Sequence, residues 1–551
     1  MDIPIRQRTK LIVGLDYGTT YSGISFALSN AADFRDIYPW TKFPGAASHG
    51  SKHCEKAPSR IAYQSENLQD LDDDVWGYQT DALPSEYDDP NLKRSLGDAL
   101  MKLPAGKTAK DVVTDYLRGM YTMFQKAVEE KLGRENLREF PMDVWLTVPA
   151  TWSEKAKILT QAAAKDAGFA SRSIDRIMLI PEPEAAAHMA LKTSVNHVHD
   201  LVEEGSGVMV CDLGGGTVDI TTYEIERISP TLRLKELCVG NGGKCGGTFV
   251  DRNLHELLAK RFGKAFTSLP ITKTGPGSEF ADEFEDKKKD FSVQSASKRP
   301  MRLSLRMEGL GRMSRLADYY DQGQSKVLLT RQDMKSLFDP VVEKILQLVT
   351  DQESRTRKTM GKTISTLVLV GGFGSSPYVK DRLKEWCGKW NIRLTTPMNG
   401  AWSAIVCGAV LRGVEGSITT EKRCRRHYGH MLSLEYCPEK HKGYDASKRR
   451  VYIDPFDRLT YLTGFMVWVI GKITADASAG VEKIGTVEYT IDGLNVESDS
   501  GVERIMEKGR MMYQVSHILR IKMSDETGLL VFKIMVGEKE VGQAKLAFSS
   551  T

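Results

Sequence analysis

The stretch Val208–Glu224, VMVCDLGGGTVDITTYE, decides the fold that we expect for this chain. A mostly apolar run leads into Asp212, three glycines follow, and an alternating segment begins after Thr217. Apolar β-formers on both sides of a turn that suits glycine predict a strand, a tight turn and a second strand. Because glycines expose backbone N–H groups, Gly214, Gly215 and Gly216 could ring a phosphate. The alternative is a glycine-rich hairpin that binds no ligand.

A second stretch with the same pattern lies near the N-terminus. Leu11–Leu28 reads LIVGLDYGTTYSGISFAL, so an apolar run ends at Asp16 and a turn centred on Gly18 precedes an alternating strand. Two such hairpins far apart in one chain predict two related lobes with a nucleotide between them. Asp212 and Asp219 stand at the mouths of the second turn, where carboxylates suit a hydrated Mg²⁺ that also takes phosphate oxygens as ligands.

These motifs resemble the actin-like ATPase superfamily and, within it, the seventy-kilodalton heat-shock (DnaK-type) chaperone family. The resemblance is strongest to a divergent, heat-shock-like branch with a reduced C-terminal part. It implies an α/β fold with two actin-like lobes, which are two copies of a ribonuclease-H-like unit, followed by a small, mostly-β domain. The matching stretches occur in the family's order, at Asp16–Gly23, Val148–Trp152, Pro181–Ala187, Asp212–Asp219, Gly246–Gly247 and Leu367–Ser376.

The domain boundaries follow from the same motifs and from changes in composition. We expect a disordered lead-in over residues 1–10 and a nucleotide-binding domain over 11–415. Within it, lobe I covers about 11–205, lobe II about 206–380, and the chain returns to lobe I over about 381–415. A polar linker, 416–430, then leads to a β-rich domain, 431–551, which resembles a reduced substrate-binding domain without a helical lid. Alternating residues predict its strands at Met431–Tyr436, Arg450–Ile453, Met466–Ile470, Thr486–Ile491, His517–Met523 and Leu529–Val536.

The resemblance also implies which residues hold ATP or ADP, Mg²⁺ and, as a further ion, K⁺. Asp16, Asp212 and Asp219 would hold the metal and its waters. Catalysis would further use Glu182 to orient water, Lys93 to reach the γ-phosphate and the attacking water, and Thr217 to contact phosphate oxygens. Other nucleotide contacts implied by the family are Gly18, Thr19, Thr20, Tyr21, Gly214, Gly215, Gly216, Gly246, Gly247, Glu285, Lys288, Lys289, Ser292, Gly371, Gly372 and Ser375.

Two of these catalytic assignments have alternatives. Lys93 lies in a loosely matching stretch, so it could be a surface lysine, with Arg94 as the neighbouring candidate. Glu182 could simply be a glutamate at a helix N-terminus, stabilised there by the helix dipole.

The chain departs from the family at several cations. Lys289 and Ser375 stand where the family has arginines that stack on adenine, and Lys157 replaces an arginine that relays the nucleotide state. Lysine lacks the planar guanidinium that stacks and pairs bidentately, so we expect altered affinity for ATP. The family's short apolar interdomain linker is not visible either.

Composition narrows the class of protein. A net charge of +4 in 551 residues is too small to argue for nucleic-acid binding, and no apolar stretch reaches membrane-spanning length. No N-terminal signal peptide is expected. Eight cysteines without a CxxC pair suggest reduced thiols rather than a disulfide framework. We therefore expect a protein of the cytoplasm or nucleus.

Three functions remain open from the sequence. The first is a weak ATPase of the chaperone type, whose nucleotide state controls an unfolded or specific client protein, with nucleotide-exchange or J-type co-chaperones. The second is a nucleotide-gated interaction protein with little or no hydrolysis. The third is a small-molecule kinase of the same superfamily, which the closer match to heat-shock motifs disfavours.

Overall fold

The structure is a computed structural model of the whole chain. Its described residues are 9–31, 34–46, 54–66, 74–82, 103–150, 152–197, 203–229, 231–294, 299–308, 317–397, 403–423, 428–435, 451–453, 460–470, 486–488, 502–507, 510–515, 517–523, 530–536 and 539–547. The chain divides into two compact units, Met1–Lys422 and Arg423–Thr551.

A first sheet contains the N-terminal hairpin. Its strands lie in the order β3-β2-β1-β7-β8, with β4 also pairing β2. The hairpin is antiparallel, whereas β1, β7 and β8 run parallel to one another. The predicted strand–turn–strand at the N-terminus is therefore confirmed. The strand bounds are β1 Leu11–Tyr17, β2 Tyr21–Leu28, β3 Tyr38–Pro39, β4 Ala57–Pro58, β7 Met142–Val148 and β8 Arg176–Pro181.

A second sheet contains the central hairpin, which is also confirmed as two antiparallel strands. Its strands lie in the order β16-β15-β9-β10-β11-β17. Its edge strand β17 comes from the segment that we expected to be a linker, and it pairs parallel to β11. The strand bounds are β9 Gly207–Leu213, β10 Val218–Arg227, β11 Arg233–Gly243, β15 Ile364–Val370, β16 Arg393–Thr395 and β17 Thr419–Glu421.

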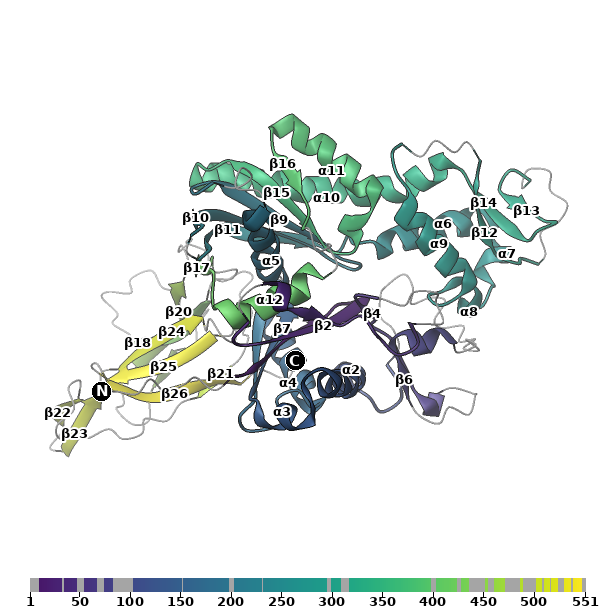
Figure 1. The fold of residues 1–551 in the computed structure, drawn as a ribbon. Coiled ribbons are helices and arrows are strands. Elements are labelled where there is room, and N and C mark those ends of the chain that lie inside the picture. The colour runs from purple at the N-terminus through teal and green to yellow at the C-terminus, as the bar shows by residue number, and fades with distance from the viewer. Residues whose placement is uncertain are drawn as a thin grey trace. The chain divides into compact units, whose positions relative to one another are not determined.

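Two helices, α5 (Glu182–His197) and α12 (Ala404–Glu415), lie between the two sheets (Figure 1). Nearly every residue of α12 is buried, as expected for a helix that is apolar on all sides. One hydrophobic cluster joins both helices to strands of both sheets, including Ile12 of β1 and Val210 of β9. This shared core holds the two glycine turns in one unit.

A second hydrophobic cluster covers the other face of the second sheet. Helices α6, α9, α10 and α11 and a small sheet, β12-β14-β13, contribute to it. Apolar residues at helical spacing after Thr330 predict a long helix, which is confirmed as α10. It begins with a capping box and contains Pro340. The bounds are α6 Thr248–Phe262, α9 Glu279–Asp290, α10 Arg331–Met360, α11 Pro377–Trp390, β12 Met301–Ser304, β13 Tyr320–Asp321 and β14 Lys326–Leu329.

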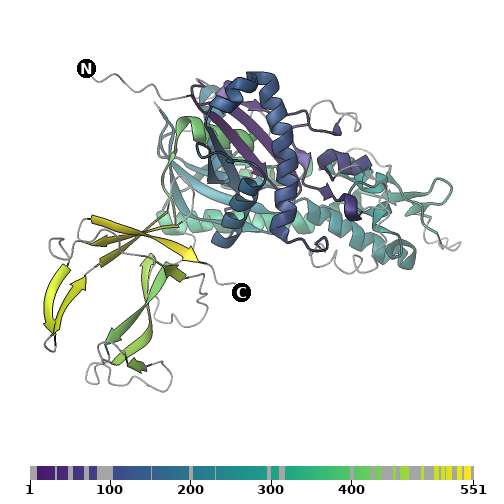
Figure 2. The same ribbon diagram turned by 90° about the horizontal axis from the view of Figure 1, so that it is seen from below.

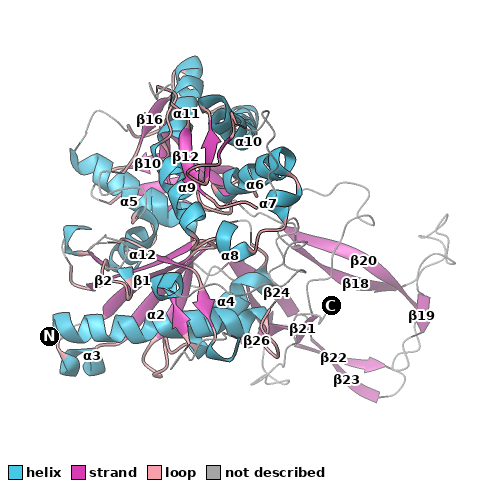
Figure 3. Ribbon diagram, turned by 90° about the vertical axis from the view of Figure 1, so that its right-hand side faces the viewer, coloured by secondary structure: helices cyan, strands magenta, loops and turns pink. Residues whose placement is uncertain are grey.

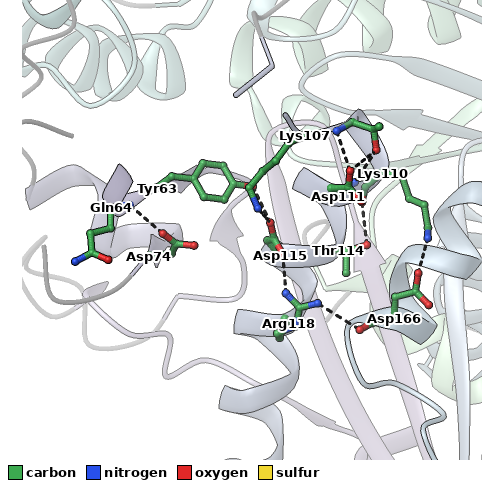
Figure 4. A network of polar contacts seen from close by, with 11 residues as sticks. Tyr63, Gln64, Asp74, Lys107, Lys110, Asp111, Thr114, Asp115, Arg118 and Asp166 are labelled. Atoms are coloured by element: carbon green, nitrogen blue, oxygen red, sulfur yellow. Dashed lines mark hydrogen bonds and ion pairs between the residues drawn. The ribbon is translucent and has the colours of Figure 1, made fainter. Parts of the chain in front are cut away.

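The helical spacing of apolar residues predicts a helix over Ala109–Leu132, and α2 has these bounds. It crosses the purple strands of the first sheet in Figure 2 and buries Leu117, Met120 and Phe124. Near its N-terminus, Asp115 accepts hydrogen bonds from Lys107 at 2.6 Å and from Arg118 at 2.6 Å (Figure 4). Helix α4 (Glu154–Asp166) is capped by Ser153 and is tied to α2 through this polar network.

Shorter elements connect these parts. None of the helices among the described residues is long and apolar enough to cross a lipid bilayer. The remaining short elements of the first unit are η1 Phe34–Asp36, β5 Ile61–Ala62, η3 Gln64–Glu66, β6 Val75–Trp76, η4 Gly77–Ala82, α3 Arg134–Glu139, α7 Lys264–Thr267, α8 Ile271–Thr274 and η6 Phe373–Ser375.

The described part of the second unit consists of strands without a helix, as Figure 3 shows. The six strands predicted there are each matched by a strand, with some shifts of their ends. Three further strands, β22, β23 and β26, were not predicted. The bounds are β18 Tyr428–Glu435, β19 Val451–Ile453, β20 Thr460–Ile470, β21 Thr486–Glu488, β22 Val502–Glu507, β23 Arg510–Val515, β24 His517–Met523, β25 Leu530–Val536 and β26 Lys539–Ala547.

Candidate functional site

The first glycine turn joins β1 to β2 and is anchored by neighbouring strands. Asp16, near the end of β1, accepts a hydrogen bond from Thr147 Oγ1 of β7 at 2.6 Å. Ser59 follows β4 and donates its hydroxyl to the Gly18 carbonyl at 2.6 Å and its backbone N–H to the Thr20 carbonyl at 2.8 Å. The turn is thus held from outside, through its carbonyl groups and through Asp16.

The second glycine turn joins β9 to β10. Asp212 and Asp219 are directly paired across the two strands, so both carboxylates belong to the base of one turn. The N-terminus of α6 closes against this turn, because the Thr248 N–H donates to the Gly215 carbonyl at 2.9 Å. A Cβ at Gly246 would collide with the carbonyls of the turn, so this approach requires glycine.

The two turns face each other. A Cβ at Gly215 would collide with the side chain of Thr20, and a Cβ at Gly216 would lie 3.3 Å from that of Thr19. Residues nearly two hundred positions apart in the chain therefore form one pair of opposed backbone loops. This is the arrangement that two phosphate-holding turns would need in order to grip the same ligand.

A single cavity of about 450 Å³ opens between the two turns. Pro149, from the VPATW stretch after β7, also reaches it. Most of the residues singled out in the sequence line it, namely Asp16, Gly18, Thr19, Thr20, Tyr21, Glu182, Asp212, Gly214, Gly215, Gly216, Thr217, Gly247, Glu285, Lys288, Lys289, Gly371, Gly372 and Ser375.

Four of the predicted residues are not among those that line the cavity. Asp219 lies beside Asp212 and is buried, and Gly246 donates its N–H to the Gly216 carbonyl at 3.3 Å. Ser292 follows α9 without reaching the cavity lining. Lys93 lies outside the described residues, so its role stays a prediction.

Acidic groups crowd the phosphate end of the cavity. Burial, together with the charges of Asp16, Asp212 and Asp219, raises the pKa of Glu182 well above its usual value. Burial and the neighbouring Asp219 raise the pKa of Asp212 to about 7. Buried carboxylates with such pKa values gain from a nearby cation, since it removes their mutual repulsion.

The donor set fits a hydrated Mg²⁺ better than a directly caged ion. The described residues contain no group of three or more His, Cys, Asp or Glu side chains arranged to hold a metal. Mg²⁺ usually keeps several waters and binds through one or two carboxylates plus phosphate oxygens. Asp16, Asp212 and Asp219 could therefore hold it through water once a phosphate is present.

The opposite end of the cavity is built by α9. Lys288 Nζ lies 2.8 Å from Asp251 Oδ1 of α6 and 2.5 Å from Glu285 Oε2, so its charge is used within the protein. Although burial opposes the charged form, these carboxylates raise the pKa of Lys288. Lys289 is half-exposed and lies 3.6 Å from Glu285 Oε1. Gly371 and Gly372 bring backbone to the same end, and Gly371 has a positive φ of 84°.

Several cavity residues were missed by sequence reasoning. Phe280, Phe284 and His255 form an aromatic wall at the α9 end, where α6 and α9 meet. Lys56 reaches the phosphate end from the segment just before β4. The helical spacing of the two phenylalanines could have indicated a buried face, whereas no motif surrounds Lys56.

Cys245 lies next to the Gly-Gly pair. Its side chain is buried, and burial raises the pKa of the thiol to about 11. Because the thiolate is the reactive form, this indicates a core cysteine rather than a redox-sensitive thiol.

Comparison with known proteins supports the heat-shock family resemblance expected from the sequence. A family model described as Hsp70 protein matches residues 109–419. The chain is 25% identical to heat shock 70 kDa protein 12B of Homo sapiens, covering 83% of this chain and 76% of that protein. It is 24% identical to heat shock 70 kDa protein 12A of Homo sapiens, covering 79% and 74%. It is also 25% identical to chaperone protein DnaK of Methanothermobacter thermautotrophicus, covering 73% and 60%.

Proposed function

Because the chain belongs to the Hsp70 family, as a divergent heat-shock-70-like branch of the actin-like ATPase superfamily, we propose that it is an ATP-binding protein whose nucleotide state controls a protein partner. The observation that carries this proposal is the opposition of the two glycine turns across one cavity. Backbone N–H groups from both turns would bind the β- and γ-phosphates. The two six-stranded sheets would then act as the two lobes of an actin-like ATPase.

The acidic end of the cavity would hold Mg²⁺, which neutralises phosphate charge when bound. Asp16, Asp212 and Asp219 would hold its waters, and K⁺ is a second ion that this acidic site could take. Glu182, at the first position of α5, would orient the attacking water. Thr19, Thr20 and Thr217 would donate hydroxyl hydrogen bonds to phosphate oxygens, and Lys93 remains a candidate for the γ-phosphate.

The α9 end of the cavity would take the nucleoside. Glu285 would accept hydrogen bonds from the ribose, while the aromatic wall of Phe280 and Phe284 covers apolar surface of the base. Gly371 and Gly372 allow the close approach of backbone to the adenosine. This division explains why the cavity is acidic at one end and aromatic at the other.

Hydrolysis would be slow or regulated. Phosphoryl transfer depends on exact positioning of the nucleotide, and the family's arginines that hold the base by stacking are replaced by Lys289 and Ser375. A nucleotide-gated interaction protein with little turnover is therefore the second candidate. The β-strand unit, Arg423–Thr551, would contact an unfolded or specific client protein, with nucleotide-exchange or J-type proteins as further partners.

Calorimetry of ATP and ADP binding with Mg²⁺ tests nucleotide binding directly. We expect saturable binding of both nucleotides, with Asp16→Asn weakening it at least tenfold. Steady-state phosphate release from the wild-type chain and from Lys93→Ala then separates a slow ATPase from a protein without turnover. Transfer of phosphate to a sugar panel would favour the small-molecule kinase instead. Absence of nucleotide binding would reject the whole proposal.

A further inference from the structure

Lys56 is placed beside the first glycine turn by strand pairing. It precedes β4, whose residues Ala57 and Pro58 pair with Ser22 and Tyr21 at the start of β2, as the neighbouring ribbons in Figure 1 illustrate. Its Nζ lies 2.5 Å from Asp16 Oδ2, and its side chain is only 10% exposed. The same side chain lines the cavity between the two turns.

Lys56 pairs directly with Asp16, and the carboxylates of Asp212 and Glu182 add further negative charge around its ammonium. Although burial opposes the ammonium, the carboxylates of Asp16, Asp212 and Glu182 raise the pKa of Lys56. A lysine ammonium carries three donors, and within the described residues one carboxylate, that of Asp16, accepts a hydrogen bond from it. Donors therefore remain for a ligand in the cavity.

The other lysines of the cavity are placed differently. Lys288 and Lys289 belong to α9, at the far end, and both lie near Glu285. Among the described residues that line the cavity, Lys56 is the lysine next to the glycine turns. Negative charge on a terminal phosphate would consequently meet a buried, preorganised ammonium at this point.

We propose that Lys56 binds the terminal phosphate of the nucleotide and so distinguishes a triphosphate from a diphosphate. This inference rests on the proposed nucleotide site, but it does not depend on Lys93. The ammonium would exchange its contact with Asp16 for the γ-phosphate oxygens, leaving Asp16 to the waters of Mg²⁺. Removing Lys56 should leave the first turn in place, because Ser59 and Thr147 anchor it independently.

The test compares ATP and ADP binding to the full chain with Mg²⁺ by calorimetry. Lys56→Met should weaken ATP roughly tenfold to a hundredfold, the range for a lost charge-assisted hydrogen bond, while ADP affinity changes less than threefold. Lys288→Met is a matched control, since that lysine also lines the cavity, pairs with carboxylates and is 10% exposed. It should weaken ATP and ADP by the same factor.

Each result has a defined meaning. Equal weakening of ATP and ADP by Lys56→Met, or no change in either, overturns the assignment of Lys56. If wild-type protein binds neither nucleotide, the proposed function fails as well, so the two failures differ. Lys56→Gln, which keeps a donor for Asp16, repeats the test if thermal unfolding shows that Lys56→Met is misfolded. It should give the same selective loss of ATP affinity.

Discussion

Lys422 Nζ lies 2.9 Å from Oε2 of Glu184, a carboxylate whose side chain is only 4% exposed. Lys422 directly follows strand β17, and Glu184 lies in the first turn of α5, two residues after Glu182 in the cavity. Although burial opposes it, Lys422 holds the pKa of Glu184 below its usual value. The ion pair therefore fixes the end of the first unit to the helix that enters the candidate site.

We expect Lys422→Met to lower the free energy of unfolding by up to about 3 kcal/mol, because a buried carboxylate loses its cation. Lys235→Met is the matched control. Its partner on β17, Glu421, is more than half-exposed, so the loss should stay below about 1 kcal/mol. Thermal and denaturant unfolding measure both variants. Equal losses would mean that burial of Glu184 does not matter.

The opposition of the two turns can be tested at Gly215. Gly215→Ala introduces a methyl group that collides with Thr20, so the turns must separate, and ATP binding should fall at least tenfold. Gly388→Ala in α11 is the control, since no atom lies near its added Cβ. It should keep full binding and raise stability by about 1 kcal/mol through helix propensity. Unchanged ATP binding by Gly215→Ala would contradict the proposed grip.

Asp212→Asn should affect stability and binding in opposite directions. Burial and Asp219 raise the pKa of Asp212 to about 7, above its unfolded value, so the folded state binds this proton more tightly. The contribution of Asp212 to the free energy of unfolding is then favourable at low pH and is lost as pH rises through about 7. At pH 8 without nucleotide, Asp212→Asn should stabilise the protein by about 1–3 kcal/mol.

At pH 5 the stabilisation by Asp212→Asn should largely disappear. The Asp212 carboxyl of the folded wild-type protein is then protonated, so it is uncharged like the amide that replaces it. Binding of ATP with Mg²⁺ at pH 8 should instead fall at least tenfold, since the amide holds the metal's waters poorly. Calorimetry at both pH values measures this. A destabilised variant at pH 8 would show that the charge of Asp212 is satisfied without a ligand.

His188 should give the protein part of its acid sensitivity. Its ring is buried and Nε2 lies 3.2 Å from Glu415 Oε2, yet burial lowers the pKa of His188. The unfolded chain therefore takes up a proton near pH 6.5 that the folded chain resists, and stability falls as pH drops below that value. Two further charged groups lie close to this pair. Lys192 forms an ion pair with Glu415, and the charge of Glu184 favours the protonated form of the His188 ring.

In His188→Gln, the decline in stability from pH 7 to pH 5.5 should be shallower, by at most about 1.4 kcal/mol per pH unit. Unfolding midpoints measured across this range provide the test. Because Glu415 has a pKa of about 2, its own titration lies at lower pH and does not interfere. If the stability of the two proteins depends on pH in the same way, His188 is excluded as the source of the acid sensitivity.

Nucleotide affinity should increase when the missing arginines are restored. Lys289 and Ser375 both line the cavity near the expected position of the base. The double variant Lys289→Arg with Ser375→Arg should bind ATP and ADP about threefold to tenfold more tightly, since stacking of guanidinium on an aromatic ring contributes about 0.5–1.4 kcal/mol. Lys287→Arg, on the same helix but outside the cavity, should change nothing. Weaker binding would mean that the base lies elsewhere.

Sequence reasoning succeeded where structure depends on neighbouring residues. The hairpins at Asp16 and Asp212, the helix Ala109–Leu132 and the capping of α10 by Thr330 all follow from periodicity, glycine and caps within a few positions. The strands β22, β23 and β26 were missed because charged and polar residues interrupt the apolar alternation in each of them. These strands form by pairing with partners, as β22 does with β23.

The order of strands, turns and helices, and the presence of two Asp–Gly turns, were thus determined by local sequence. The tertiary structure alone decided that Gly215 meets Thr20, that Lys56 reaches Asp16, and that β17 adds an edge to the second sheet. These contacts join residues far apart in the chain, and their energy comes from burial and charge that no short window contains. For that reason Lys56, which no sequence motif surrounds, could be assigned to the site only from the tertiary structure.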